Sequence, residues 1–457
     1  MPTILGANTL SGGFEVANSL RFNEGDSASL NKTGTSGDRR TWTWSCWLKR
    51  CTLGSGNSHL IFGASSDDFS TDYFDISISG QDVINIQDYQ GSEALRYKTT
   101  RVFRDISAWY HIVVRVDTTQ STASNRVRVY INGVEETSFS TETDPSQNTQ
   151  LLVNKNVVHR IGGRTGDYSD LYLAECVLVD GSSLAPTSFG EFDEDSPNVW
   201  KPIDVSGLTF GNNGFYLDFE DSSNLGNDKN GGTDFTVNNL AATDQSTDTC
   251  TNNFPTLNSL VKAPSSITFS EGNLKAVHPG SWTGVPATIG VQNGKWYWEC
   301  KVTTGNSANA FTGICIEDVN FNDSTVYNET GLILYFVDGR KTVDGTDTES
   351  FFTSLATNDI VGVALDLDSG TKTVTFTKNG SASGSAVNLT SNFDNKFIFP
   401  VGIGNSSSAT SNWEFNFGSP HYSISSGNSD ANGHGNFEYA VPSGHFSINT
   451  KNLAEHG

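Results

Sequence analysis

Aromatic side chains outside the expected strands are the residues of this sequence best suited to sugar recognition. A flat ring packs on the apolar face of a pyranose, and Asp or Asn side chains beside it can hold the sugar hydroxyls. The candidates for a glycan-binding site are Trp282, Tyr327, Tyr89, Tyr168, Asp167 and Asp170. Trp282 is the best of these, because it lies in the Gly/Pro-rich stretch 278–286. The alternative is that each ring covers a sheet edge or packs at a subunit contact.

Calcium is the metal that the oxygen-rich loops would suit best. Hard cations take several carboxylate and carbonyl oxygens from flexible loops. Asp228, Asn230 and Asp234 surround Gly231-Gly232 and supply such oxygens, and Asp167 with Asp170 is a similar pair. Asp, Asn and Gly are also ordinary turn residues, so a plain turn is the competing interpretation. We therefore expect no obligatory metal or cofactor, with calcium as the one ion that these loops would suit.

Other catalytic and binding chemistries find no matching motif. The nearest approach to a Gly-x-Ser-x-Gly nucleophile elbow is Gly380 to Gly384, which has Ala382 at the central position. No Gly-rich loop leads into a helix with a Lys, so nucleotide binding lacks a motif. The eight histidines show no metal-ligand spacing, and His111 lies in an expected strand, where a structural role is favoured.

Composition and charge exclude several classes of protein. The chain has 457 residues, with 51 acidic and 28 basic side chains, which gives a net charge of −23. No basic stripe is present to neutralise phosphates, so we expect no nucleic-acid partner. No run approaches the roughly 18 apolar residues of a membrane helix, and no secretory signal is visible at the N-terminus. Six cysteines in so long a chain do not form a disulfide scaffold, and we expect them to be reduced.

The elements that must position these residues are β-strands. Apolar side chains alternate with other residues along the chain, which is the pattern of a half-buried strand. Such runs include 42–48, 74–78, 110–116, 127–131, 296–302, 361–367 and 413–417. Asn132-Gly133 and Asn379-Gly380 follow strands as hairpin turns, because both residue types tolerate positive φ. The sequence predicts an all-β protein of packed antiparallel sheets.

Composition divides the chain into five segments. Two blocks of alternating strands are separated by a region dense in Asn, Asp, Gly and Thr, which holds one expected strand, 214–220. The end of the chain is similarly rich in Gly, Ser and Asn. We predict an N-terminal extension (1–15), a first sandwich (16–200), a connector (201–264), a second sandwich (265–422) and an extended C-terminal segment (423–457).

Specific stretches of the sequence resemble known families. The stretches 108–120 (AWYHIVVRVDTTQ), 126–134 (RVRVYINGV) and 171–181 (LYLAECVLVDG) resemble a laminin-G/pentraxin-like domain of the concanavalin A-like lectin type. The stretches 294–299 (GKWYWE), 359–370 (DIVGVALDLDSG) and 374–380 (VTFTKNG) resemble a SPRY domain. The resemblance implies two tandem concanavalin-like antiparallel β-sandwiches, or jelly rolls, with an irregular connector.

The order of these blocks and the linker between them resemble tail-fibre or appendage proteins of bacteriophages. The stretches that carry this resemblance are DFEDSSNLGNDKNGG (218–232) and TNNFPTLNSL (251–260). The resemblance implies a non-enzymatic virion protein that is displayed on the particle surface and recognises a host cell-surface glycan or receptor. We expect other virion proteins as partners, a homo-oligomeric state, and no insertion into membranes.

Three alternatives remain open at this point. A purely structural virion protein, in head decoration or tail scaffold, would make only protein contacts. A polysaccharide depolymerase would need paired carboxylates, and 191–195 is the best string for them. The Glu-x-Asp-x-x-Glu pattern of concanavalin-type glycoside hydrolases, aligned on Glu191 and Asp193, requires Glu at position 196, where Ser196 stands. A secreted cellular lectin is the fourth hypothesis, and the missing signal argues against it.

Overall fold

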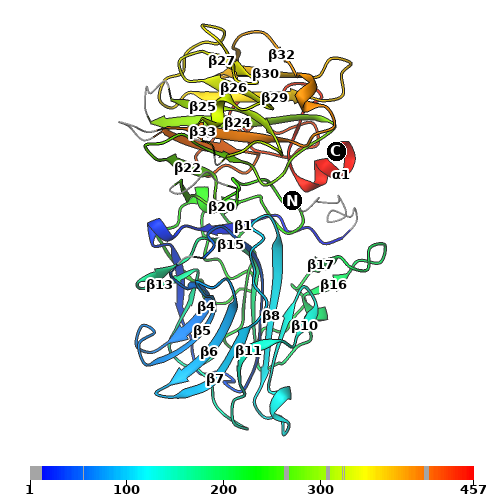
Figure 1. Cartoon of the computed structure of the whole chain (residues 1–457). Coiled ribbons are helices and arrows are strands. Elements are labelled where there is room, and N and C mark those ends of the chain that lie inside the picture. The colour runs from blue at the N-terminus through cyan, green and yellow to red at the C-terminus, as the bar shows by residue number, and fades with distance from the viewer. Residues whose placement is uncertain are drawn as a thin grey trace. The chain divides into compact units, whose positions relative to one another are not determined.

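The computed structural model describes residues 13–54, 56–261, 267–304, 309–321, 323, 325–405 and 411–457. Residues 1–12 of the predicted N-terminal extension and 262–264 of the predicted connector lie outside these ranges. The described residues form two compact units, one up to Thr251 and one from Asn252 onwards. Both are built from antiparallel β-sheets, which confirms the all-β sandwich prediction (Figure 1).

One sheet of the first unit carries the strands that the alternating Trp, Ile and Val residues predict. Its order is β10 (Val134–Glu136), β9 (Val127–Ile131), β8 (Trp109–Asp117), β3 (Thr41–Arg50), β15 (Leu171–Asp180), β1 (Ser19–Phe22) and β20 (Gln245–Ser246), with β18 (Phe215–Leu217) also on β15. Trp42, Trp44, Cys46 and Leu48 face the core and are fully buried. Asn132 and Gly133 have φ of 50° and 77°, the conformation expected of the hairpin turn.

The facing sheet of the first unit contains the strands whose outer surface forms the candidate site. Its order is β11 (Phe139–Thr143), β7 (Glu93–Thr99), β6 (Ile84–Gln90), β5 (Asp72–Ile78), β4 (His59–Ser65), β12 (Val158–Ile161), β2 (Ser29–Thr33) and β19 (Thr236–Asn238). Phe74, Ile76, Ile84 and Ile86 point into the core. Because successive side chains of a strand point to opposite faces, the residues between them lie on the outer surface of this sheet.

Short elements complete the first unit. Two small hairpins are β13 (Gly163–Arg164) with β14 (Asp167–Tyr168), and β16 (Gly190–Phe192) with β17 (Trp200–Pro202). The 3-10 turns are η2 (Glu24–Asp26), η3 (Ala123–Asn125), η4 (Pro186–Ser188) and η5 (Ala242–Asp244). Strands β18, β19 and β20 come from the predicted connector and pair with β15, β2 and β1. The connector residues up to Thr251 therefore extend both sheets of the first unit, since Phe215, Leu217 and Phe235 are buried in its core.

The second unit has two sheets of its own. The first runs β21 (Thr268–Ser270), β22 (Lys275–His278), β34 (Ser411–Asn416), β24 (Lys295–Thr304), β29 (Ile360–Asp366), β30 (Thr373–Lys378) and β31 (Ser381–Ala382), with β32 (Val387–Asn388) on β30. The second runs β23 (Thr283–Pro286), β33 (Ile398–Gly404), β25 (Ala310–Ile316), β26 (Leu332–Phe336), β27 (Lys341–Val343) and β28 (Thr346–Thr348). Trp296, Trp298 and Trp413 are fully buried between them.

The C-terminal segment folds back onto the second unit. It adds β35 (Phe446–Ser447), which pairs in parallel with β24, and the helix α1 (Thr450–His456). The 3-10 turns of this unit are η6 (Val326–Asn328) and η7 (Ser391–Phe393). No helix among the described residues is long and apolar enough to cross a membrane.

Candidate functional site

The outer surface of β4 to β7 gathers polar and aromatic side chains from four neighbouring strands. We call it the β4–β7 face. Its outward residues are Tyr73, Asp75 and Ser77 of β5, Asn85, Gln87 and Tyr89 of β6, and Arg96 and Lys98 of β7. Strand register places Gly63, Asp75, Gln87 and Arg96 in one row across the sheet. The face therefore brings together residues that are up to 33 positions apart in the sequence.

An aromatic strip runs along one side of this row. The rings of Tyr73 and Tyr89 stack, with centroids 5.8 Å apart, and Phe69 lies 6.1 Å from Tyr73. All three rings are partly exposed. Phe69 lies over Gly63, where an added Cβ would come within 2.6 Å of the Phe69 ring. Gly63 thus leaves the space that lets the strip continue onto β4.

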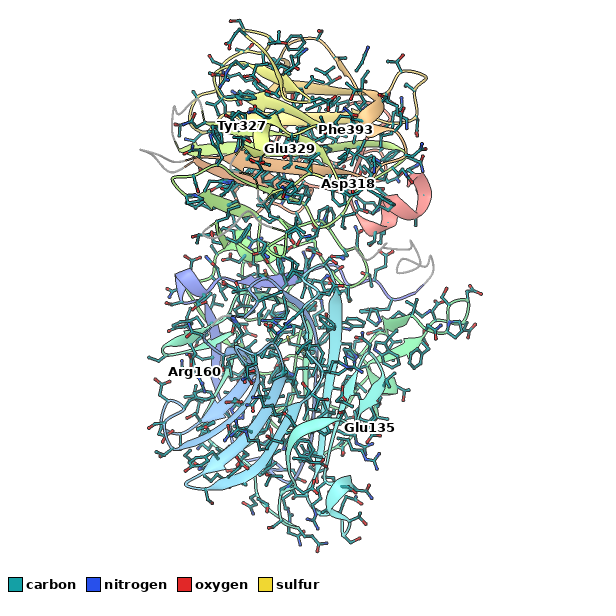
Figure 2. All side chains as sticks on the ribbon, in the orientation of Figure 1. Glu135, Arg160, Asp318, Tyr327, Glu329 and Phe393 are labelled. Carbon is teal, nitrogen blue, oxygen red and sulfur yellow. The ribbon has the colours of Figure 1, made fainter. Side chains whose placement is uncertain are left out.

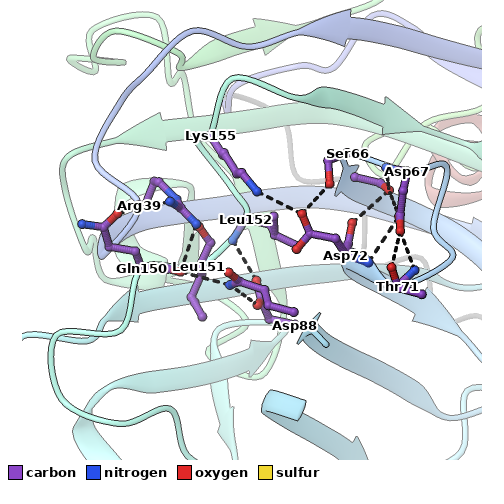
Figure 3. Close-up of polar contacts among 12 residues, drawn as sticks. Arg39, Ser66, Asp67, Thr71, Asp72, Asp88, Gln150, Leu151, Leu152 and Lys155 are labelled. Carbon is purple, nitrogen blue, oxygen red and sulfur yellow. Dashed lines mark hydrogen bonds and ion pairs between the residues drawn. The ribbon is translucent and has the colours of Figure 1, made fainter. Parts of the chain in front are cut away.

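The loop that carries Phe69 is held by its own carboxylates (Figure 3). Asp68 and Phe69 both have left-handed backbones, with φ of 56° and 65°, which is costly for residues other than glycine. Asp67 accepts hydrogen bonds from the Thr71 amide at 2.7 Å and the Thr71 hydroxyl at 2.6 Å. Lys155 donates to Asp72 at 2.9 Å, which ties the end of the loop to the segment before β12. These bonds fix the position of Phe69.

A short polar floor lies next to the strip. Asp75, Ser77, Asn85 and Gln87 are only 3–9% exposed, because longer side chains stand around them. The Asp75 carboxylate accepts from the Ser77 hydroxyl at 3.3 Å and the Asn85 amide at 3.1 Å. Burial raises the pKa of Asp75 to about 6, although Arg164, Ser77 and Asn85 oppose that shift.

Arginine side chains border the floor. Arg164, on β13, donates through Nε and Nη2 to Asp167 at 3.0 and 2.8 Å, and its Nη1 lies 3.7 Å from Asp75 Oδ2. Its guanidinium also lies 5.0 Å above the centre of the Phe69 ring. Arg160, from β12, pairs with Asp68 at 3.0 Å (Figure 2). Aromatic rings, hydrogen-bonding groups and charges thus share one surface.

Two of the predicted site residues belong to this face, and the others are dispersed. Tyr89 is in the aromatic strip, and Asp167 holds Arg164. Tyr168 pairs with Gly163 in the β13–β14 hairpin. Asp170 accepts from the Glu24 amide and the Thr52 hydroxyl at 2.7 and 2.8 Å, contacts that fasten loops. The expectation that Tyr89 and Tyr168 lie in loops is wrong. Tyr89 is in β6, whose polar residues mask the alternation, and Tyr168 is in the two-residue strand β14, which is too short to show a period.

Trp282 and Tyr327 lie together in the second unit. Their ring centroids are 4.4 Å apart, and Trp282 also stacks on Phe311 at 4.9 Å. Both rings are half-buried against the core of that unit. Figure 2 labels Tyr327 there. This aromatic pair is a second, smaller surface on which a ring could pack.

Asp228 and Asp234, two of the residues considered for calcium, make contacts within the chain. Asp228 Oδ2 lies 3.5 Å from the Lys32 ammonium, and Asp228 Oδ1 accepts from the Tyr216 amide at 3.1 Å. Asp234 accepts from the Asp228 amide at 2.9 Å and from Asn224 at 2.8 Å. Lys32 supplies the positive charge at this carboxylate. Among the described residues, no group of three or more His, Cys, Asp or Glu side chains is placed to hold a metal.

The carboxylates considered for catalysis are engaged by one lysine. Lys201 on β17 contacts Glu191 at 3.3 Å and Asp193 at 3.2 Å. Asp193 also accepts from the amides of Asp195 and Ser196. This hairpin uses its carboxylates for an ion pair and a turn.

Models of two known protein families each match part of one unit. The laminin G-type family of the concanavalin A-like lectin/glucanases superfamily matches residues 22–174, and the SPRY domain family matches residues 295–419. The chain carries a concanavalin A-like domain followed by a SPRY domain. No curated protein sequence matches the chain.

Solved structures resemble parts of the chain at low identity. The SPRY domain of human HERC1 is 18% identical, covers 35% of this chain and 96% of its own, and has a TM-score of 0.29. A human SPRY domain is 16% identical, with 33% and 94% coverage and a TM-score of 0.26. A heptameric SAP-like pentraxin from Limulus polyphemus is 15% identical, with 38% and 80% coverage and a TM-score of 0.28.

Sequence reasoning missed most of the β4–β7 face of the concanavalin A-like domain. Tyr73 and Asp75 were expected only as the outward residues of an alternating strand, and no motif links them to Phe69 or Arg164. The polar residues between Ile84 and Tyr89 were the available signal. An alternating strand with Asn, Gln and Tyr on its outward side indicates a polar sheet surface.

Proposed function

We propose that this chain is a non-enzymatic virion protein of a bacteriophage, a tail fibre or appendage, that binds host-surface glycans through the β4–β7 face. The observation that carries the glycan proposal is the aromatic strip Phe69–Tyr73–Tyr89 beside a row of hydrogen-bonding side chains. Rings give a pyranose an apolar platform, and the polar row offers partners for its hydroxyls.

The structure of the face supports recognition rather than catalysis. Glycoside hydrolysis uses two carboxyl groups that flank the scissile bond. Among the described outward residues of β5, β6 and β7 on this face, Asp75 is the carboxylate on the floor, and Gln87 and Asn85 stand opposite and beside it. Asp167 is committed to Arg164 through two contacts. Aromatic rings and hydrogen-bonding side chains are enough for sugar binding, which requires no pair of catalytic carboxyl groups.

The virion context rests on the sequence resemblance to phage appendage proteins. A single face of this kind binds weakly, and several copies on one particle raise avidity without new contacts. We therefore propose a homo-oligomer, held in place by other virion proteins. The Trp282–Tyr327 pair of the SPRY domain is a second place for a sugar ring in the same chain.

A glycan array probed with the full chain tests the proposal. We expect binding by the natural protein and loss of binding in the double variant Tyr73→Ala/Tyr89→Ala. Phe192→Ala is the matched control, because Phe192 is a 42% exposed aromatic in the same domain, on β16 outside the face. Equal binding by all three proteins would assign the sugar contact elsewhere, and no binding by any native oligomer would favour a purely structural virion role.

Immunogold labelling of intact particles tests the context separately. Antibody against the chain should decorate the particle surface. Particles that lack the protein would contradict the virion assignment while leaving the glycan site open to its own test. Release of new reducing ends from host polysaccharide by the purified chain would contradict the non-enzymatic assignment.

A further inference from the structure

Two arginines lie on opposite sides of the same buried carboxylate of the β4–β7 face. Arg164 Nη1 lies 3.7 Å from Asp75 Oδ2, beyond hydrogen-bond distance. Arg96 is two strands away in the Gly63–Asp75–Gln87–Arg96 row, and its charge also acts on Asp75 and Tyr73. Asp75 is therefore flanked by positive charges that it does not fully bind.

The same place holds hydrogen-bonding groups that lack partners. Arg96 Nε and Asn85 Oδ1 are buried and make no hydrogen bond to any described residue. Asn85 is 8% exposed, and its amide nitrogen donates a hydrogen bond to Asp75. An unsatisfied buried donor or acceptor destabilises the fold, so such groups in a native structure point to a ligand or water that completes them.

We infer that the β4–β7 face selects glycans that carry an acidic group, and that this group binds between Arg96 and Arg164 in competition with the Asp75 charge. This inference rests on the proposed glycan function and names the sugar class. Guanidinium groups bind carboxylate and sulfate oxygens through paired N–H donors. The aromatic strip would hold the ring of the same sugar.

The charges around Asp75 set the direction of its pH dependence. The groups that face it are Arg164 from β13 and Arg96 from β7, with Tyr73 on its own strand. Asp167 lies behind Arg164, and Glu93 pairs with Arg96 at 3.5 Å. Burial already raises the pKa of Asp75 to about 6. A bound anion would raise that pKa further, because like charges disfavour each other. Binding of an acidic sugar is therefore coupled to proton uptake by Asp75. The affinity increases as the pH falls from the higher pKa of the bound state to about 6, and it is constant below that.

Isothermal titration with the full chain tests this inference with three probes of matched length. They are an oligogalacturonate, a sulfated dextran oligosaccharide and a neutral dextran oligosaccharide. The acidic probes should bind more tightly than the neutral one, and about tenfold more tightly at about pH 5 than at about pH 7.5. The two acidic probes distinguish a carboxylate from a sulfate as the preferred group.

Asp75→Asn should remove the pH dependence and bind the acidic probe at about pH 7.5 as tightly as the natural protein does at about pH 5. Glu135→Gln is the matched control, because Glu135 is an exposed carboxylate on β10 that pairs with Arg128 on β9, outside this face (Figure 2). Arg164→Gln should abolish the preference for acidic over neutral probes.

The outcomes separate the two proposals. Equal affinity for acidic and neutral probes, or a pH dependence that persists in Asp75→Asn, overturns this inference and leaves the glycan function standing. Failure of all three probes together with an empty glycan array overturns both.

Discussion

At the scale of single residues, burial decides which carboxylates the folded chain keeps protonated. Glu175 lies at the irregularity where β15 shifts register against β3, with a left-handed backbone at φ 51°. It is 6% exposed and accepts a hydrogen bond from the Tyr216 hydroxyl at 2.7 Å. Burial raises its pKa to about 8. The folded state therefore holds a proton that the unfolded chain releases.

Glu175→Gln should stabilise the protein at alkaline pH. Because the folded pKa is above the unfolded value, the natural protein loses stability as the pH rises from the ordinary Glu range through about 8. Glutamine keeps an acceptor for Tyr216 and carries no charge to bury. The stability gain should be negligible at about pH 4 and reach a few kcal/mol by about pH 9, measured by urea unfolding. A gain that does not change with pH, or an equal gain in the exposed control Glu191→Gln, would contradict this explanation.

At the scale of elements, hydrogen-bonded loops and the C-terminal segment hold residues in place on the sheets. Asp67 holds a loop in which two consecutive residues have left-handed backbones. Asp67→Ala should leave the sandwich folded and loosen Phe69. Glycan affinity should fall by about two- to tenfold, the cost of ordering a side chain at the moment of binding. Titration against the best array ligand measures it, and unchanged affinity would show that Phe69 is not part of the contact.

The C-terminal segment is a strap on the SPRY domain. The Glu299 carboxylate on β24 accepts from the amides of Glu438 and Tyr439 at 3.0 and 2.8 Å, and Phe437 is fully buried against Tyr297. The sequence predicted this segment as extended, because its Gly, Ser and Asn content hides the few anchoring residues. It covers the outward side of β24 and β29.

Phe437→Ala should destabilise the SPRY domain by about 3–5 kcal/mol, the cost of removing a fully buried aromatic ring. Thermal unfolding of the full chain, followed by the fluorescence of its buried tryptophans, measures the loss. Phe397→Ala is the control, since Phe397 is 38% exposed in the same domain. If both substitutions cost the same, the strap contributes little to stability.

The sequence reveals elements more readily than the site. Trp42, Trp44, Trp296 and Trp298 alternate with other residues, so their strands could be predicted from period alone. The β4–β7 face depends on which strands are neighbours and in what register. Neither strand pairing nor register can be predicted from a local sequence pattern. Arg164 meets Asp75 only because β13 lies next to β4. Of the proposed site, Tyr89 and Asp167 were named from the sequence for their residue types and their expected position in loops.

At the scale of the whole molecule, net charge and local charge act in opposite directions. The chain carries −23, while the β4–β7 face sets Arg96, Arg160, Arg164 and Lys98 against a similar number of carboxylates. Under the proposed function the chain meets an anionic bacterial envelope. Its net charge would then oppose binding, whereas the nearly balanced charge of the face would not. Exposed charges interact over about 10 Å at 0.1 M salt and about 3 Å at 1 M.

Binding of the full chain to host cells should therefore be weak at low salt and pass through a maximum as salt is added. Salt first screens the general repulsion and then weakens the arginine contacts to an acidic sugar. A labelled chain and a sodium chloride series at constant pH measure this, with beads that carry a neutral glycan as the control. Strongest binding at the lowest salt would contradict it.

Chelation should leave the fold unchanged, because Lys32 neutralises Asp228 from within the chain. The thermal unfolding midpoint should be the same with and without a calcium chelator. A lower unfolding midpoint in the presence of the chelator would contradict this prediction, because it would mean that a bound ion stabilises the fold.

The Lys32 ammonium has a wider consequence. It is placed over the rings of Phe215 and Phe235, 5.8 and 5.4 Å from their centres, and beside Asp228. A counter-ion that is part of the polypeptide cannot be diluted away or exchanged. The charge of Asp228 in this loop is therefore balanced from within the chain, whatever cations the surrounding medium contains.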